Sequence, residues 1–193
     1  MTPLYIFDLD GTLADLTHRR PLVELQDGSP VEVQGAPAIY RGVHDVAVDN
    51  VWVEFPETGI WAYHKSDVYF RKDWDAFHAA CVDDKPIPHM ITLLNFLAEQ
   101  NSTDGVWIWS GRMSTVELRT RKWLLKHLGW CPPLKMRKAK DFTPDDQLKE
   151  RWLHALPAED RARLQMVFDD RTRVVEMWRR NGVPCAQVAP GDF

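Results

Sequence analysis

The sequence is poor in cysteine and lacks long apolar runs. Its three cysteines, Cys81, Cys131 and Cys185, are widely spaced and form no CxxC pair. We therefore expect reduced thiols in a cytoplasmic setting, and neither a zinc site nor a disulfide framework. No apolar stretch reaches membrane-spanning length, and the chain begins directly in a strand-like pattern. We expect neither a transmembrane helix nor a signal peptide.

Two catalytic signatures are also missing. The seven histidines are scattered and form no HExxH, so we assign none of them to a metal. The sequence contains no GxxxxGK[ST] either, which argues against binding ATP for phosphorylation. The net charge of -4 conceals an asymmetry, because the range 112–151 is rich in Lys and Arg whereas 21–70 is mostly acidic. Only the first of these regions is suited to face phosphates.

The order of apolar segments predicts an α/β fold. With 193 residues, we expect one domain with a subordinate insertion and a full core. Short apolar strands alternate with segments of helical period, which implies a parallel, Rossmann-like sheet with helices on both faces. The expected strands are 4–10, 105–111, 164–170 and 185–191, and the expected helices are 73–82, 87–101, 114–130, 144–156 and 171–182.

The segment 21–72 interrupts this alternation. It shows period-two patterning, aromatic residues and Gly/Pro turns, which favour a few antiparallel strands. Because it follows the first strand directly, we expect a small β-rich cap that projects over the end of that strand. The core would then consist of 1–20 and 73–193.

The polar residues of highest interest follow the expected strands. "FDLDGT" contains Asp8 and Asp10, "WSGR" contains Ser110 as its second residue, and "VFDD" ends in Asp169 and Asp170. Two carboxylates at the end of a buried strand are unfavourable unless a cation or a reaction justifies them. Parallel strands present their carboxyl ends at one edge, so these groups could converge there, together with a lysine from the helix 144–156.

Their chemistry is complementary. Several carboxylates in one place suit a hard divalent cation such as Mg²⁺, while Lys149, an arginine and a serine hydroxyl suit a phosphate. A carboxylate beside both the Mg²⁺ ion and the phosphate could act as nucleophile. A second carboxylate two residues later could donate and accept the proton of the reaction. The pattern therefore indicates phosphoryl transfer through an aspartyl-phosphate.

The motifs "FDLDGTLAD", "WSGR", "DDQLK" and "VFDDR" resemble those of the haloacid dehalogenase (HAD) superfamily of phosphatases. The stretches "RTRKWL" and "DDRTRVVEMWRRNGVPCAQVAPGDF" resemble more closely the 3'-phosphatase domain of phage-type polynucleotide kinase/phosphatases. The similarity covers about 4–20 and 73–193. The missing GxxxxGK[ST] means that we expect the kinase half of those enzymes to be absent.

The resemblance implies a role for each matching residue. The first aspartate of the DxD pair would be the nucleophile and a metal ligand, and the second the acid/base with its backbone carbonyl on Mg²⁺. Asp169 and Asp170 would complete the metal site, and Ser110 and Lys149 would hold the transferring phosphate. Asp145 would orient Lys149 or an arginine. The remaining positions assigned to the phosphate or substrate are Thr12, Arg19, Gly111 and Arg112.

The function that follows is Mg²⁺-dependent removal of a terminal 3'-phosphate from DNA or RNA, extending to 2',3'-cyclic phosphate ends. The partner would be a nucleic-acid 3' end, and the location cytoplasmic, in the host if the chain is phage-encoded. The acidic insertion leaves a second candidate open, a nucleoside monophosphate phosphatase with a closed cap. A non-catalytic module that binds nucleic-acid ends is disfavoured, because every catalytic position carries the expected residue type. The sequence leaves the oligomeric state open.

Aromatic and basic residues could also contact bases and phosphates. Among the nine tryptophans, we favour core packing for those in the expected strands and helices, and consider Trp52, Trp61 and Trp74 the more credible base contacts. The basic run "LKMRKAK" could be a solvated face or could guide a polyanion.

Overall fold

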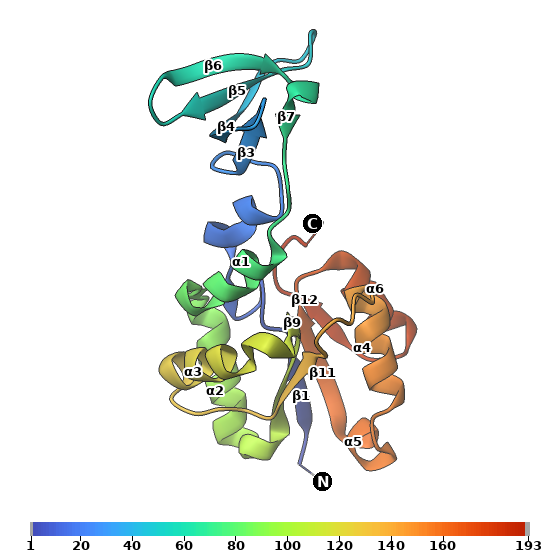
Figure 1. The fold of residues 1–193 in the computed structure, drawn as a ribbon. Helices are drawn as coiled ribbons and strands as arrows, with labels where there is room; N and C mark the ends of the chain where they lie inside the picture. The colour runs from blue at the N-terminus through green and yellow to red at the C-terminus, as the bar shows by residue number, and fades with distance from the viewer. Residues whose placement is uncertain (1, 192–193) are drawn as a thin grey trace. The chain divides into compact units, whose positions relative to one another are not determined.

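The computed structural model describes residues 2–191, which divide into two compact units (Figure 1). The core unit is formed by the chain up to Leu16 and from Val82 onward, and the inserted unit is Thr17–Cys81. The inserted unit is thus wider at both ends than the segment 21–72 expected from the sequence pattern. A cap role for it stays a prediction.

The core unit contains a five-stranded parallel sheet with the order β10-β9-β1-β11-β12. The expected parallel α/β architecture is therefore confirmed. One strand, β10, was not expected, because its sequence "LKMR" alternates cationic and apolar residues within the basic run. The strands are β1 Leu4–Phe7, β9 Val106–Met113, β10 Leu134–Arg137, β11 Leu164–Asp169 and β12 Cys185–Gln187.

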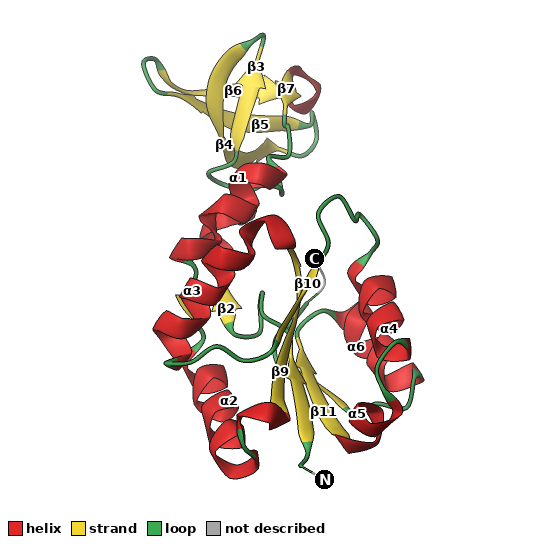
Figure 2. Cartoon of the chain, turned by 60° about the horizontal axis from the view of Figure 1, so that its bottom comes forward, coloured by secondary structure: helices red, strands yellow, loops and turns green. Residues whose placement is uncertain are grey.

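Helices cover both faces of this sheet (Figure 2). On one face, α2 and α3 pack against Phe7, Ile108 and Phe168, and on the other α4 and α6 pack against Ile6 and Val167. The alternation of apolar side chains along each strand supplies both cores. The helices are α2 Pro88–Asn101, α3 Glu117–Leu128, α4 Asp145–His154, α5 Ala158–Arg163 and α6 Thr172–Arg180, and the short 3-10 turns are η4 Thr103–Gly105 and η5 Ser114–Val116.

The strand register decides which polar residues meet. Phe7 pairs with Ile108 of β9 on one side and with Phe168 of β11 on the other. Asp8, which follows Phe7, donates its backbone N–H to the carbonyl oxygen of Phe168 at 2.8 Å. The residues that follow these paired positions therefore lie at the same carboxyl edge of the sheet. A two-stranded ribbon, β2 Ala14–Asp15 with β8 Lys85–Pro86, also belongs to the core unit.

The inserted unit contains a second sheet, which is antiparallel and has the order β6-β5-β4-β3-β7. Its own small core includes Val31, Val33, Tyr40, Val51 and Val53. The antiparallel strands expected here are confirmed. The elements are η1 Thr17–Leu22, β3 Pro30–Val33, β4 Ala36–Asp45, β5 Asn50–Phe55, β6 Gly59–His64, η2 Lys65–Asp67, β7 Val68–Tyr69 and α1 Trp74–Ala79. The 3-10 turn η3 Ala80–Asp83 spans the boundary with the core unit.

Among residues 2–191, no helix has both the length and the apolar composition needed to cross a membrane.

Candidate active site

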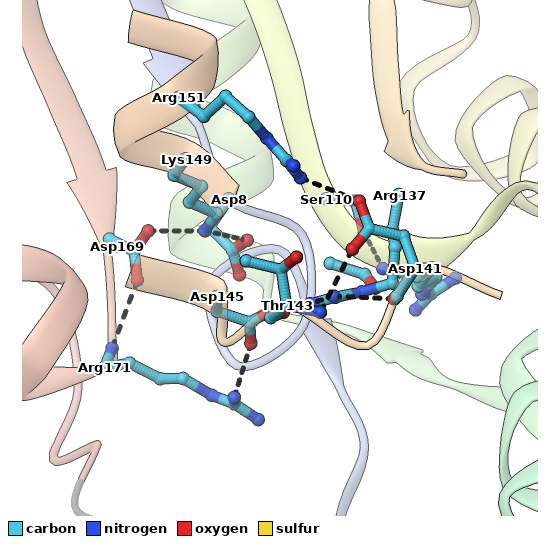
Figure 3. A network of polar contacts seen from close by, with 12 residues as sticks. Asp8, Ser110, Arg137, Asp141, Thr143, Asp145, Lys149, Arg151, Asp169 and Arg171 are labelled. Atoms are coloured by element: carbon cyan, nitrogen blue, oxygen red, sulfur yellow. Dashed lines mark hydrogen bonds and ion pairs between the residues drawn. The ribbon is translucent and has the colours of Figure 1, made fainter. Parts of the chain in front are cut away.

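A buried lysine joins two of the strand-end carboxylates (Figure 3). Lys149 Nζ, from α4, donates to Asp8 Oδ1 at 2.6 Å and to Asp169 Oδ2 at 2.7 Å. All three side chains are buried. Lys149 lies one turn into α4, whose sequence places Leu148 and Leu153 toward the core, so the helix brings the ammonium group to the sheet edge. The structure thus unites residues that are up to 161 positions apart.

Burial changes the proton affinities of this group. It raises the pKa of Asp8 well above its usual range, against the lowering effect of the Lys149 charge, and Asp169 and Asp170 add to the increase. Burial also raises the pKa of Asp170 to about 6, with a further increase from the charge of Asp169. For Lys149, burial opposes protonation, but the charges of Asp169 and Asp8 outweigh it and raise the pKa. Lys149 is therefore a permanent cation in this site.

The residues fit a divalent cation. Asp8, Asp169 and Asp170 each offer a carboxylate oxygen, and these oxygens lie within 4.8 Å of one another. Both oxygens of Asp170 are buried and have no hydrogen-bond partner among the described residues. With all three carboxylates ionised, Lys149 neutralises one charge and leaves an excess of two. Oxygen-only ligands with that excess charge match Mg²⁺.

A glycine makes room for this cluster. Gly11 has a φ of +83°, and a Cβ at that position would lie 2.0 Å from Asp170 Oδ2. The turn after the DxD pair therefore requires glycine for its conformation and also for its close approach to the carboxylate. The neighbouring Thr12 is fully buried, and its hydroxyl has no hydrogen-bond partner among the described residues.

Asp10 is held by an arginine. Arg112 donates from Nε to both carboxylate oxygens of Asp10, at 3.0 and 3.1 Å, and from Nη2 to Oδ1 at 2.5 Å. Its Nη2 also contacts the carboxylate of Asp84, and the side chains of Arg112 and Asp84 are both inaccessible to solvent. We expected Arg112 to contact the phosphate or the nucleic-acid end. In the structure its guanidinium binds two carboxylates and fixes the orientation of Asp10, and a substrate contact stays a prediction.

Ser110 and Gly111 lie on β9 beside these groups. Ser110 is fully buried, and its Oγ accepts a hydrogen bond from the backbone N–H of Arg112 at 3.2 Å. The hydroxyl proton therefore remains available to donate to an anion. A Cβ on Gly111 would lie 2.7 Å from Asp145 Oδ1, so this position is packed against the start of α4.

Asp145 lies between two arginines (Figure 3). Arg171 Nη1 donates to Asp145 Oδ2 at 2.5 Å, and Arg137 Nη2 contacts Asp145 Oδ1. Arg137 Nε also donates to the carbonyl oxygen of Gly111 at 2.8 Å. Sequence reasoning missed Arg137, Arg171 and Asp84. The sequence signals for these residues are weak. Arg137 lies in the basic run "LKMRKAK", which is typical of a solvated face, Arg171 directly follows the Asp169-Asp170 pair, and Asp84 precedes an ordinary Lys-Pro.

Arg19 belongs to the inserted unit. Its side chain is fully buried, its guanidinium carbon lies 4.2 Å from the centroid of the Phe77 ring, and Nη1 donates to the Phe77 carbonyl oxygen at 3.3 Å. Within this unit the cation therefore joins η1 to α1. Its expected contact with substrate stays a prediction.

Comparison with known proteins now identifies the family. A family model described as the polynucleotide kinase PNKP phosphatase domain matches residues 65–193. The chain belongs to this family. It is a HAD-type phosphatase domain and, by class, a phosphoric monoester hydrolase. The match does not include Asp8 and Asp10. The structure supplies their link to the matched region, through Lys149 and Arg112.

Solved structures support the same fold. This phosphatase is similar to a chain in the structure of a Pnkp1/Rnl/Hen1 complex, with a TM-score of 0.62 and 23% identity, covering 100% of this chain and 48% of the other. A second similar chain, from the Pnkp1/Rnl/Hen1 RNA repair complex, gives a TM-score of 0.59 and 23% identity, with coverages of 100% and 44%. The phosphatase thus spans about half the length of the chains it matches.

Proposed function

We propose that this phosphatase removes the terminal 3'-phosphate from a polynucleotide through an aspartyl-phosphate on Asp8. The observation that carries the proposal is the buried group formed by Asp8, Asp169, Asp170 and Lys149. It combines a nucleophile, an oxygen site for a divalent cation and a permanent ammonium group. Phosphoryl transfer to an aspartate with hydrolysis of the resulting acyl-phosphate uses all three.

In the first step, a carboxylate oxygen of Asp8 attacks phosphorus and the bond to the 3'-oxygen breaks. Asp10, as a carboxylic acid, gives its proton to the departing 3'-oxygen, which leaves as a hydroxyl group. Lys149 and the hydroxyl of Ser110 hold the oxygens of the transferring phosphoryl group. The salt bridge from Arg112 keeps Asp10 oriented, and the partly exposed side chain of Asp10, at 23%, gives its proton access to the leaving group.

In the second step, water attacks the phosphorus of the aspartyl-phosphate. Asp10, now a carboxylate, takes a proton from that water, inorganic phosphate departs, and Asp8 is restored. Bound Mg²⁺ would supply charge neutralisation between Asp8 and the phosphate oxygens, held by Asp8, Asp169, Asp170 and the backbone carbonyl of Asp10.

Family membership favours a polynucleotide as the substrate. RNA is included because one of the similar solved chains belongs to an RNA repair complex. We infer that 2',3'-cyclic phosphate ends are also processed, as the resemblance to kinase/phosphatases implies. A nucleoside monophosphate is the competing substrate. The acidic inserted unit, in which Glu32, Asp45 and Glu57 are exposed, is the feature that favours it.

The test compares phosphate release from four substrates: a 3'-phosphorylated oligonucleotide, the same oligonucleotide with a 2',3'-cyclic end, a 3'-mononucleotide and a 5'-mononucleotide. We expect the highest kcat/KM for the 3'-phosphorylated oligonucleotide, complete loss with EDTA, and recovery with Mg²⁺. Affinity for the oligonucleotide should fall steeply with salt, whereas that for mononucleotides should not. Preference for a mononucleotide at all salt concentrations would contradict the proposal.

A further inference from the structure

One aromatic side chain of the core unit is strongly exposed beside the candidate active site. Phe142 is 80% exposed, and it lies in the connection between β10 and α4, three residues before Asp145. A phenyl ring that stays exposed contributes almost no hydrophobic stabilisation to the fold. A single exposed aromatic residue on a mobile loop would need no explanation. The exposed ring of Phe142 indicates a binding role only if its loop is ordered.

The backbone on both sides of Phe142 is fixed. Arg137 Nη1 donates to the carbonyl oxygen of Asp141 at 3.0 Å and to that of Thr143 at 2.5 Å. The Asp141 carboxylate accepts hydrogen bonds from the backbone N–H of Thr143 at 3.0 Å and from Arg151 Nη2 at 2.7 Å. These bonds are part of the network in Figure 3. The backbone that carries the aromatic residue is therefore ordered without a ligand, so binding does not have to order the loop, which lowers the entropic cost of binding.

The same arginine connects the loop to the site. Arg137 is buried, and it also contacts Asp145 and the carbonyl oxygen of Gly111, the residue after Ser110. One guanidinium group thus sets the position of Phe142 relative to the strand that carries Ser110 and to the first turn of the helix that carries Lys149. A few hydrogen bonds of one side chain therefore place the backbone at Phe142 at a fixed position relative to the expected phosphate-binding residues.

The charged residues around Phe142 favour a nucleic acid over an apolar protein partner as the ligand. The basic run that precedes it divides into two parts. Lys135 lies over the rings of Trp109 and Trp152, and Arg137 is buried, whereas Lys138 and Lys140 are exposed. The nearby Asp141 is paired with Arg151. An exposed ring beside two exposed cations suits a base and its backbone phosphates, whereas an apolar protein partner would need a broader apolar patch.

We propose that Phe142 is a stacking platform for a nucleobase in the 3'-terminal segment of a single-stranded polynucleotide, and that Lys138 and Lys140 contact its backbone phosphates. This inference rests on the proposed function and deepens it, because it makes single-stranded polynucleotide the preferred substrate class. Stacking on an aromatic side chain tolerates any base, so the platform confers preference for chain length and strandedness and not for sequence.

The kinetic test uses Phe142→Ala, Phe142→Leu and Phe142→Trp, with Phe96→Ala on α2 as a control for loss of another exposed phenyl ring. For Phe142→Ala and Phe142→Leu, we expect kcat/KM for a 3'-phosphorylated oligonucleotide to fall about 5- to 100-fold relative to kcat/KM for a 3'-mononucleotide, as loss of one stacked base requires. Phe142→Trp should preserve the wild-type ratio. An unchanged ratio in Phe142→Ala, or equal losses on both substrates, would overturn the platform.

An abasic oligonucleotide provides the matched substrate. Wild type and Phe142→Ala should have the same kcat/KM for the abasic oligonucleotide, because it has no base to stack. Replacing Lys138 and Lys140 together by alanine should reduce the dependence of log K on log salt by about 0.7 for each lost phosphate contact. An unchanged salt dependence would remove the two lysines from the proposal.

A binding measurement separates this inference from the proposed function. Fluorescence anisotropy of a labelled single-stranded oligonucleotide, with Asp8→Asn as the background, reads affinity without turnover. A loss of about 5-fold or more on adding Phe142→Ala supports the platform even if the wild type fails to release phosphate from oligonucleotides. Equal affinity with and without the phenyl ring overturns it even if the phosphatase activity is as proposed.

Discussion

The two sheets of this phosphatase differ in where their charged side chains lie. At and beside the carboxyl edge of the parallel sheet, the core unit buries a set of ionisable groups: Asp8, Asp84, Arg112, Arg137, Lys149, Asp169 and Asp170. The inserted unit keeps its ion pairs at the surface, as in Arg41 with Glu54 and Asp27. Among its described residues, only Arg19 is a buried side chain of the Asp, Glu, Lys or Arg type. The antiparallel sheet thus has the charge distribution expected for a stable fold, whereas the parallel sheet buries charged residue types at its candidate active site.

The difference has a physical cost. A buried charge loses hydration, and its partner recovers that loss only with good geometry and complete hydrogen bonding. The inserted unit avoids the cost, because its core is made of valines, an alanine and a tyrosine. The core unit accepts it because a dry, preorganised site strengthens the interactions with a transferring phosphoryl group. Four experiments would break or sharpen this contrast.

Asp8→Asn should have the largest effect. It removes the proposed nucleophile, so we expect phosphate release to fall at least ~10³-fold. Stability should not fall, because the substitution is nearly isosteric and removes one member of a cluster of like charges. The measurement is kcat together with the melting temperature. Glu57→Gln, an exposed carboxylate in the inserted unit, is the control and should leave both unchanged. Retained turnover in Asp8→Asn would refute the assignment.

Asp84→Asn compared with Asp27→Asn tests the contrast in ion pairs. Asp84 and Arg112 have 0% exposed side chains, whereas the side chain of Asp27 is 74% exposed. Loss of the buried carboxylate should reduce the free energy of unfolding by about 3 kcal/mol, and loss of the surface one by less than ~1 kcal/mol. Activity should fall only for Asp84→Asn, because Arg112 orients Asp10. Urea unfolding measures both, and similar values for the two variants would break the comparison.

Val53→Ala and Val167→Ala test whether the two cores are energetically separate. Both valines are buried, one on β5 and one on β11, and each truncation should cost about 1–3 kcal/mol. Hydrogen exchange should show faster amides only in the inserted unit for Val53→Ala and only in the core unit for Val167→Ala. Hydrolysis of a small phosphomonoester should fall only for Val167→Ala, which loosens the strand ending in Asp169. Exchange that increases across both units in either variant would show a single cooperative core.

The three cysteines give the smallest and most local test. Cys131 is exposed, whereas Cys81 in the inserted unit and Cys185 in the core unit are buried. Burial raises the pKa of the Cys185 thiol to about 12. Alkylation near pH 8 should modify Cys131 at least about tenfold faster than either buried thiol. Mass spectrometry of labelled peptides over time gives all three rates. Cys81 should react before Cys185, because it lies in a short 3-10 turn, whereas Cys185 lies on a strand of the parallel sheet.

Much of the fold could be predicted because local patterns and tertiary structure agree. The short apolar segments became β1, β9, β11 and β12, and the periodic segments between them became helices. The strand β10 was missed because Lys135 and Arg137 disguised it. Lys135 places its ammonium group over tryptophan rings, and Arg137 is buried among polar partners. A cation buried by specific contacts is indistinguishable in sequence from one in solvent.

The candidate site divides in the same way. The DxD pair, Ser110, Lys149 and the Asp169-Asp170 pair were predictable because each follows or lies beside a recognisable element. Asp84, Arg137, Arg171 and Phe142 were not, because each stands in a segment whose composition is typical of a surface loop or turn. Core packing was expected for the tryptophans in the strands and helices, and Trp109, Trp123 and Trp178 are buried in the core. Base contacts by Trp52, Trp61 and Trp74 stay a prediction.

The sequence by itself determined the strand and helix order and the kinds of reactive group that follow the strands, because apolar periodicity and turn residues act over a few positions of the chain. Only the tertiary structure decided which of those groups share a site. The parallel register places Asp8 beside Asp169, and α4 adds Lys149 from the other side. Coulomb and hydrogen-bond energies depend on distances of a few ångströms, which the chain acquires only when its sheet has formed.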